Sequence, residues 1–313
     1  MGKRELGVGA SGGLRGKGKS GLHSLKRVTS KTGVLVFIYL MECGSALAGG
    51  YLPKVIYGKD ERLEAAYYPN ERVRALSRSV AGRVGKYLLV KEGNEFALPN
   101  LTLEHTMGVC ANERFATQTS FVECSGFLVG ADLLVTAGHC IQNQSDCDQN
   151  KWVFDYVLSA HSLPENKVYG CKEIVSQDLS VANDYAVIRL DRPVYDRKPL
   201  ALRQSGEVSP QSKLIVMGHP SGLPLKIDDN GSVREIPADQ NYFVAELDTF
   251  GGNSGSPVLN QQTLEVEGIL VRGDRDYSWN PELSCAVANV CANGSCRGED
   301  VQKITKIKGL LQI

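Results

Sequence analysis

The sequence contains no apolar run long enough to cross a membrane. Its N-terminal apolar run, residues 34–41, has eight residues and ends at Glu42, whereas a membrane-spanning helix needs about 20. The sequence also lacks C-x-x-C pairs and Cys/His clusters with zinc-ligand spacing, and it shows no internal repeat. We therefore expect neither a membrane anchor nor a metal site.

The chain carries no net charge, but its charges are unevenly distributed. Residues 1–48 contain eight Lys or Arg and two Glu, a net charge of +6, so the remaining 27 basic and 33 acidic residues give −6. An acidic body does not attract a polyphosphate backbone. We therefore expect no nucleic-acid partner.

The N-terminal segment has the features of a secretory signal. Basic residues precede the apolar run, and Ala46-Leu47-Ala48 follows it as an A-x-A cleavage site. We expect residues 1–48 to be removed and the mature protein to be extracellular or periplasmic, without membrane contact. The Gly/Lys/Ser-rich stretch before Lys31 is longer than usual, which leaves a real tail or a misplaced start codon as alternatives.

Export would account for the cysteine content. Of nine cysteines, Cys43 leaves with the signal, and an even number remains, as is usual when exported proteins pair their cysteines. The remaining eight are Cys110, Cys124, Cys140, Cys147, Cys171, Cys285, Cys291 and Cys296. We therefore expect disulfide bonds.

Beyond Ala97 the sequence consists of short β-rich runs separated by Gly, Pro, Asn and Asp. This pattern is typical of an all-β barrel or sandwich. The strands that we expect are 121–129, 133–136, 152–157, 185–190, 213–217, 242–247 and 266–271. The polar, proline-marked stretch 192–210 suits a linker between two halves.

Two segments instead show the spacing of an amphipathic helix. In 70–84, apolar residues recur at steps of three and four behind Asn70, which can cap a helix. The same period connects Val301, Ile304, Ile307 and Leu311. We expect both segments to be helical packing faces without a chemical role.

Three short segments together hold the residues for acyl transfer. His139 lies in Thr-Ala-Gly-His-Cys, Asp184 begins Asp-Tyr-Ala-Val, and Ser254 lies in Gly-Asn-Ser-Gly-Ser-Pro. A serine hydroxyl can attack a carbonyl while an imidazole takes its proton and a carboxylate orients the imidazole. The order His, Asp, Ser differs from that of α/β-hydrolases and of subtilisins.

From about Val55 to the C-terminus the chain resembles the trypsin/chymotrypsin superfamily. Asn253, in the serine motif, is similar to the bacterial branch that includes the V8-type glutamyl endopeptidases. The resemblance implies an all-β fold of two packed six-stranded antiparallel barrels with a C-terminal helix. Residues 55–195 would form an N-terminal arm and the first barrel, residues 196–313 would form the second, and the active site would lie between the barrels.

The resemblance also implies a serine endopeptidase that acts on polypeptides as a monomer and without a cofactor. His139 would be the general base, Asp184 its orienting partner and Ser254 the nucleophile. The backbone amides of Gly252 and Ser254 would form the oxyanion hole, where negative charge develops during the reaction.

Some of the disulfide pairs follow from the same resemblance. Cys124 and Cys140 resemble the pair that ties the strand before the catalytic histidine to the histidine loop, and Cys147 with Cys171 would staple a hairpin. For the other four, Cys110, Cys285, Cys291 and Cys296, three pairings stay open.

The resemblance also indicates where substrate specificity is determined. Asp248 stands six residues before Ser254, where trypsin has the acid that pairs with a substrate Lys or Arg. The histidine that V8-type enzymes use for acidic substrates is replaced by Leu270. The further substrate-binding residues would be Thr249, Val271, Arg272 and Gly273.

These features leave three hypotheses for function. We expect a secreted endopeptidase that cleaves after Lys or Arg. A glutamyl endopeptidase that uses Arg272 in place of the missing histidine is the alternative within enzymes. A catalytically silent homologue that serves as a binding protein is the alternative from another class.

The segment that begins at Val55 resembles the mature start of V8-type enzymes and directly follows Lys54. We expect residues 49–54 to be a short propeptide that the zymogen removes itself, since a trypsin-like enzyme cuts after lysine. The alternative is that signal peptidase alone acts. Asn253 stands where animal trypsins have the aspartate that pairs with the new N-terminus, so that ion pair cannot form here.

Overall fold

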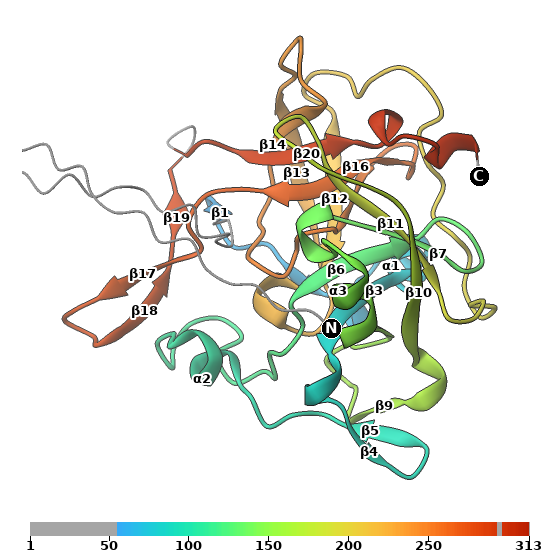
Figure 1. Cartoon of the computed structure of the whole chain (residues 1–313). Coiled ribbons are helices and arrows are strands. Elements are labelled where there is room, and N and C mark those ends of the chain that lie inside the picture. The colour runs from blue at the N-terminus through green and yellow to red at the C-terminus, as the bar shows by residue number, and fades with distance from the viewer. Residues whose placement is uncertain (1–54, 293–295, 313) are drawn as a thin grey trace, which may run out of the picture. The chain divides into compact units, whose positions relative to one another are not determined.

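In this computed structural model, residues 55–292 and 296–312 are described. The predicted signal peptide and propeptide, residues 1–54, lie outside the described residues. Two barrels of antiparallel strands dominate the described part (Figure 1).

The first barrel is closed by six antiparallel strands in the order β10, β11, β7, β6, β3 and β8. Its strands are β3 (Val80–Gly85), β6 (Cys124–Leu128), β7 (Leu133–Thr136), β8 (Asn150–Phe154), β10 (Val168–Leu179) and β11 (Asp184–Leu190). Alternate side chains point inward along each strand. Leu134, Trp152, Phe154 and Ile188 fill this interior and are fully buried.

The second barrel also has six strands, and it closes because β12 pairs with both β15 and β13. Its strands are β12 (Lys213–Gly218), β13 (Lys226–Glu235), β14 (Tyr242–Glu246), β15 (Pro257–Asn260), β16 (Val266–Arg272) and β20 (Glu299–Lys303). Leu214, Phe243, Val258 and Val301 are fully buried in its core. The predicted fold class of two six-stranded antiparallel barrels is therefore confirmed.

The two barrels share one apolar cluster. Val135 and Ala137 of the first barrel belong to the same cluster as Ile215 and Met217 of the second. Removing such side chains from water is the main force that holds packed layers together. This packing brings the end of β7 next to the loop that contains the serine motif.

The N-terminal arm, residues 55–64, is tied to the second barrel by hydrogen bonds, although the first barrel follows it in the sequence. Its strand β1 (Ile56–Tyr57) pairs in parallel with β19 (Val290–Cys291). Its strand β2 (Leu63–Glu64) adds to the edge of β13. The start of the described chain therefore belongs to the surroundings of the second barrel.

Smaller elements decorate the barrels. The remaining strands are β4 (Val90–Glu92), β5 (Glu95–Ala97), β9 (Ser162–Pro164), β17 (Tyr277–Asn280) and β18 (Cys285–Ala288). The α-helices are α1 (Glu71–Ser77), α2 (Leu103–Met107) and α3 (Gln144–Gln149), and single turns of 3-10 helix are η1 (Ala65–Tyr67), η2 (Lys86–Leu88), η3 (Gly138–Cys140), η4 (Glu165–Lys167), η5 (Pro220–Gly222), η6 (Ile304–Lys306) and η7 (Leu310–Gln312). Within the described ranges, every helix is too short or too polar to pass through a bilayer.

The predicted helix over 70–84 is shorter than expected. Asn70 caps it as predicted, because its side chain accepts hydrogen bonds from the amides of Arg72 and Val73. The helix ends at Ser77, and the apolar residues Val80 and Val84 lie on β3 instead. Their burial in the first barrel outweighs the local helical spacing.

The prediction of a C-terminal helix is wrong. Val301 lies on β20, which pairs with β14 and β16. Ile304 and Leu311 lie in separate 3-10 turns, and Gly309, with φ at +77°, interrupts the chain between them. Spacing alone does not distinguish a helix from a buried strand followed by two turns.

All eight predicted disulfide cysteines are paired. The two pairs that the resemblance implied, Cys124–Cys140 and Cys147–Cys171, are confirmed. The other four cysteines pair as Cys110–Cys285 and Cys291–Cys296.

Candidate active site

His139 and Asp184 meet at the end of the first barrel. Strand β7 pairs with β11, so the turn that carries His139 after β7 lies beside the start of β11, where Asp184 lies. Nδ1 of His139 lies 2.8 Å from one carboxylate oxygen of Asp184, and the backbone amide of His139 donates to the other at 3.0 Å. Both oxygens of the carboxylate thus hold the histidine in one orientation.

The environment of Asp184 favours its charged form. Burial by itself raises the pKa of this carboxyl group, but the hydrogen bonds and the charge of His139 outweigh burial and lower the pKa below its usual range. The second barrel also holds Asp184 in place, because the backbone amide of Asp184 donates to the side chain of Gln302 at 3.1 Å. A charged Asp184 can stabilise a protonated imidazole.

The histidine turn requires a glycine at position 138. A Cβ there would lie 2.9 Å from the backbone nitrogen of Tyr185 and 3.0 Å from the carbonyl oxygen of Asp178. Only glycine therefore allows the turn to pack this closely against β11. This packing sets the position of His139 relative to Asp184.

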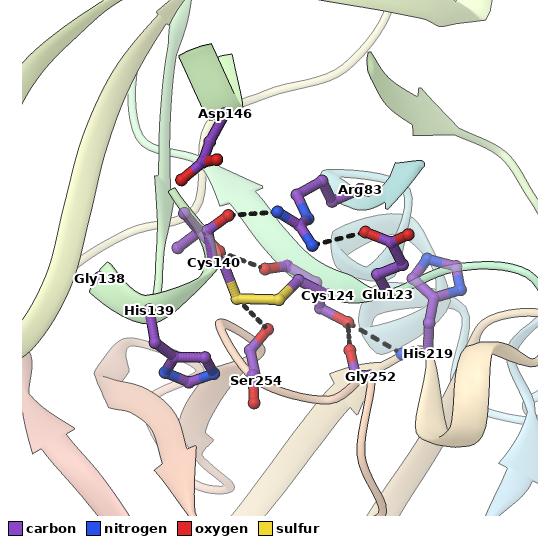
Figure 2. The surroundings of a disulfide bond; sticks show 12 residues. Arg83, Glu123, Cys124, Gly138, His139, Cys140, Asp146, His219, Gly252 and Ser254 are labelled. Atoms are coloured by element: carbon purple, nitrogen blue, oxygen red, sulfur yellow. Dashed lines mark hydrogen bonds and ion pairs between the residues drawn. A yellow bond between two sulfur atoms is a disulfide. The ribbon is translucent and has the colours of Figure 1, made fainter. Parts of the chain in front are cut away.

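The disulfide Cys124–Cys140 joins strand β6 to the turn that contains His139, and it lies near Ser254 (Figure 2). The ring of His139 has a nitrogen within 4.8 Å of the sulfur of Cys140, and that sulfur lies 3.7 Å from the carbonyl oxygen of Ser254. The two sulfurs bind each other, so this group offers no thiolate for a metal ion.

The serine motif is fixed to the first barrel through its backbone. The amide of Ser125, on β6, donates to the carbonyl oxygen of Ser254 at 2.8 Å. Figure 2 shows Ser254 and the ring of His139 in the surroundings of the same disulfide bond, Cys124–Cys140. Ser254 itself is only 6% exposed. The three residues of the sequence motifs are thus brought together around one disulfide.

Gly252 occupies a turn that other residues could not adopt. The amide of Asn253 donates to the carbonyl of Phe250 at 3.0 Å, and Gly252 has φ at +89°, as the third residue of a type II turn requires. A Cβ on Gly252 would also lie 2.4 Å from the carbonyl oxygen of His219. Position 252 therefore needs glycine for two independent reasons.

The direction of the Gly252 amide follows from its neighbours. The carbonyl of Gly251 accepts a hydrogen bond from the amide of Ser221. Since N–H and C=O point in opposite directions across a trans peptide, the amide of Gly252 points away from Ser221. The carbonyl of Gly252 is also fixed, because the hydroxyl of Ser125 donates to it at 2.8 Å.

Asn253 lies in the protein interior. Its side-chain oxygen accepts a hydrogen bond from the hydroxyl of Ser256 at 3.3 Å, and the residue is 2% exposed. A Cβ on Gly218 would lie 2.4 Å from the same oxygen. This hydrogen bond joins two residues of the serine motif within the interior.

Asp248 is bound by the N-terminal arm. One of its carboxylate oxygens accepts from the amide of Tyr57 at 2.7 Å, and the other accepts from the amide of Glu61 at 3.0 Å. Its own amide donates to the carboxylate of Asp228 at 2.9 Å. Burial raises the pKa of Asp248, and burial together with the charge of Asp248 raises the pKa of Asp228. The structure thus places both carboxylate oxygens of Asp248 in contact with the N-terminal arm.

A carboxylate that the sequence interpretation missed lies between the predicted pocket residues. Oε2 of Glu299 accepts a hydrogen bond from the hydroxyl of Thr249 at 2.9 Å. A Cβ on Gly273 would lie 1.9 Å from the same atom. Glu299 is fully buried, and together with burial its charge raises the pKa of Tyr57. The sequence interpretation expected no strand at 299–303, because this strand is defined by its pairing with β14 and β16.

Arg272 points away from Asp248. Its Nε lies 3.1 Å from a carboxylate oxygen of Asp300, and its guanidinium lies over the ring of Tyr242 at 5.5 Å from the centroid. Val271, the preceding residue, is buried in the apolar cluster between the barrels. The structure therefore joins Arg272 to Asp300 and not to Asp248.

Comparisons with known proteins agree with the fold. Residues 124–269 match the family model of the trypsin-like peptidase domain. Over 155 residues the chain is 30% identical to secreted RxLR effector protein 73 of Plasmopara viticola, covering 44% of this chain and 38% of that protein. Over 167 residues it is 26% identical to the glutamyl endopeptidase of Staphylococcus epidermidis, covering 50% of this chain and 57% of that protein. The chain thus spans about half the length of the curated relatives it matches.

Similar solved structures include a Glu endopeptidase in complex with MPD, at 18% identity and a TM-score of 0.46, with 80% of this chain and 94% of that chain covered. The VesB protease of Vibrio cholerae matches at 15% identity and a TM-score of 0.46, with 78% and 64% covered.

Proposed function

We propose that the protein is a secreted serine endopeptidase that cleaves peptide bonds after Lys or Arg, on the premise that residues 124–269 match the family model of the trypsin-like peptidase domain. The observation that carries the proposal is the contact of His139 with both oxygens of Asp184, near the disulfide whose sulfur lies 3.7 Å from the carbonyl oxygen of Ser254. The relatives named glutamyl endopeptidases act by the same class of reaction.

In the proposed reaction the hydroxyl of Ser254 attacks the substrate carbonyl carbon and passes its proton to Nε2 of His139. Asp184 holds Nδ1–H of the imidazole and stabilises the imidazolium that forms. The amides of Gly252 and Ser254 would bind the oxygen on which negative charge develops. His139 then donates its proton to the leaving amine, and water releases the acyl group from Ser254.

Two buried carboxylates support the preference for a cationic side chain. Glu299 lies between Thr249 and Gly273, and Asp248, which directly precedes Thr249 in the chain, is buried as well. A carboxylate in such a place attracts an ammonium or guanidinium group and repels an acidic side chain. Arg272, which the glutamyl alternative requires in the pocket, contacts Asp300 instead.

Export is supported by the four disulfide bonds, because such bonds persist in oxidising compartments. The Plasmopara viticola relative is itself named as secreted. We propose that the mature chain acts outside the cytoplasm on polypeptide substrates.

The test uses purified secreted protein with Ser254→Ala as its matched control. Peptide pairs that differ only in Lys or Glu before one bond are offered to both proteins. We expect the wild type to cleave the Lys peptide faster and the variant to cleave neither. Faster cleavage of the Glu peptide would favour the glutamyl endopeptidase.

A second measurement addresses the silent homologue. An organophosphate serine reagent should label Ser254 in the wild type, because only an activated hydroxyl attacks it. Failure to label folded, processed protein would favour a binding protein without catalytic activity.

A further inference from the structure

A cavity of about 500 Å³ lies beside the proposed catalytic residues. Its lining includes Val181, which is in the loop before Asp184, and Arg272 with Gly273 at the end of β16. Tyr242, Arg297 and Asp300 also line the cavity. We refer to this space as the Arg272 cavity.

Arg272 holds its guanidinium group ready for a ligand. Nε faces Asp300, the Tyr242 ring lies beneath the group, and the side chain is 25% exposed. Among the described residues, neither terminal nitrogen of Arg272 has a hydrogen-bond partner. The Nε side of the group makes an ion pair with Asp300 but no hydrogen bond. A guanidinium with unpaired terminal nitrogens can bind a carboxylate through two parallel hydrogen bonds.

Asp300 does not cancel the positive charge of the cavity. Arg297 donates to both oxygens of Asp300, at 2.9 and 2.8 Å, and also donates to the carbonyl of Gly273 at 3.3 Å. Asp300 is 3% exposed, so its charge is enclosed by two arginines. Among the charged residues that line the cavity, two guanidinium groups thus stand against one carboxylate, and the carboxylate of Glu299 lies nearby, against Gly273.

The cavity lies at the end of β16, where the predicted substrate-binding residues Val271, Arg272 and Gly273 are found. Val271, Arg272 and Gly273 lead from the neighbourhood of Ser254 and Glu299 to the cavity. An extended substrate advances about 3.3 Å per residue, so a side chain a few positions from the cleaved bond can reach it.

We propose that the Arg272 cavity binds an acidic side chain of the substrate, two to four positions before the cleaved bond. This inference rests on the proposed function and adds a second requirement to it. A preferred substrate then carries Asp or Glu shortly before the Lys or Arg at which it is cut. Acid recognition by Arg272 is thereby separate from cation recognition near Glu299.

The test measures binding without catalysis. Peptides with Lys before the expected bond carry Glu, Gln or Lys at the second, third or fourth position before it, and they are titrated into Ser254→Ala protein by fluorescence anisotropy. We expect the Glu peptide to bind about 10-fold tighter than the Gln peptide at one of these positions, as a charge-assisted bidentate contact provides. The Lys peptide should bind more weakly than both.

Variants assign the preference to one side chain. Arg272→Gln in the same background should bring the Glu-to-Gln ratio to about 1, and Arg272→Lys should keep part of it because lysine binds as a point charge. Arg275→Gln removes an exposed arginine outside the cavity lining and should leave the ratio unchanged. Thermal unfolding of each variant monitors the fold.

Equal binding of Glu and Gln peptides at all three positions would overturn the inference, as would a ratio that survives Arg272→Gln or the absence of any measurable binding. Because this readout needs no turnover, it fails separately from the proposed function. A wild-type protein that hydrolyses no peptide would contradict the proposed function. The ratio of Glu-peptide to Gln-peptide binding would still decide whether the cavity binds an acidic side chain.

Discussion

The carboxylate of Glu299 lies in the space that a side chain at Gly273 would need. Glu299 begins β20, and Gly273 directly follows β16, the strand with which β20 pairs in the second barrel. The absence of a side chain at Gly273 thus leaves room for a buried charge next to Thr249. This relationship makes Glu299 the first residue to change in a study of specificity.

We expect Glu299→Gln to lower kcat/KM for Lys and Arg peptides by about 10- to 100-fold. The amide keeps the shape and the hydrogen bond to Thr249 but removes the charge that would pair with a cationic side chain. Steady-state rates on Lys, Arg and Leu peptides measure this effect. Glu282→Gln, at an exposed glutamate, is the control. An unchanged preference for Lys and Arg would show that Glu299 has no role in selection.

The proposed nucleophile and base give the largest expected losses. Ser254→Ala and His139→Ala should each reduce turnover by about 10⁴- to 10⁶-fold, since the members of such a triad act as a unit. The double variant should be no worse than either single one. Single-turnover assays on a Lys peptide provide the measurement. If Ser254→Ala kept more than about a tenth of the wild-type rate, with contaminating proteases excluded, the proposed mechanism would be wrong.

The sequence was sufficient for the fold class and for the three residues proposed for the reaction. Each of His139, Asp184 and Ser254 lies in a short local motif, so its surroundings can be interpreted from neighbouring residues. The strand at 133–136 was predicted with its observed bounds, because alternation and flanking turn residues are also local signals.

The parts that could not be predicted depend on contacts between distant segments. Asp248 and Tyr57 are 191 positions apart, and no local pattern shows that the arm binds this carboxylate. The end of the chain was predicted as a helix because apolar residues recur there at steps of three and four positions. Pairing of β20 between β14 and β16 decides the true conformation, and only the assembled barrel reveals it.

The buried pair of Asp228 and Asp248 makes the free energy of unfolding depend on pH. Burial and the charge of Asp248 raise the pKa of Asp228 to about 7, whereas the pKa of an aspartate in an unfolded chain is about 4. Between these values the folded state keeps a proton that the unfolded state has lost, so this group's contribution to stability falls as pH rises.

We therefore expect Asp228→Asn to remove part of that fall. Urea unfolding of the wild type and the variant at intervals from pH 4 to pH 8 measures the difference. The gap in unfolding free energy between the proteins should shift in favour of the variant as pH rises through this range. A gap that does not change with pH would mean that Asp228 titrates normally in the folded protein. Asp239→Asn, at an exposed aspartate, serves as the matched control.

Maturation gives the last prediction, because the described chain begins against the predicted pocket. The amide of Thr249 donates to the carbonyl of Val55 at 3.3 Å, and Val55 is 1% exposed. A protease therefore reaches the bond between Lys54 and Val55 before the arm docks, or while the arm is released. An enzyme that cleaves after lysine can cut this bond in another copy of itself.

We expect wild-type protein to begin at Val55 and Ser254→Ala protein to begin at Gly49, as N-terminal sequencing or mass spectrometry of the secreted chains would show. Adding a trace of active wild type to the Ser254→Ala protein should convert it to the Val55 form, because the cut occurs between molecules. Lys54→Gln should block conversion without affecting secretion, since only the residue before the cut has changed. Val55 at the start of both proteins would assign the cut to a separate protease. Gly49 at the start of both would show that residues 49–54 are never removed, and that the arm docks with these residues still attached.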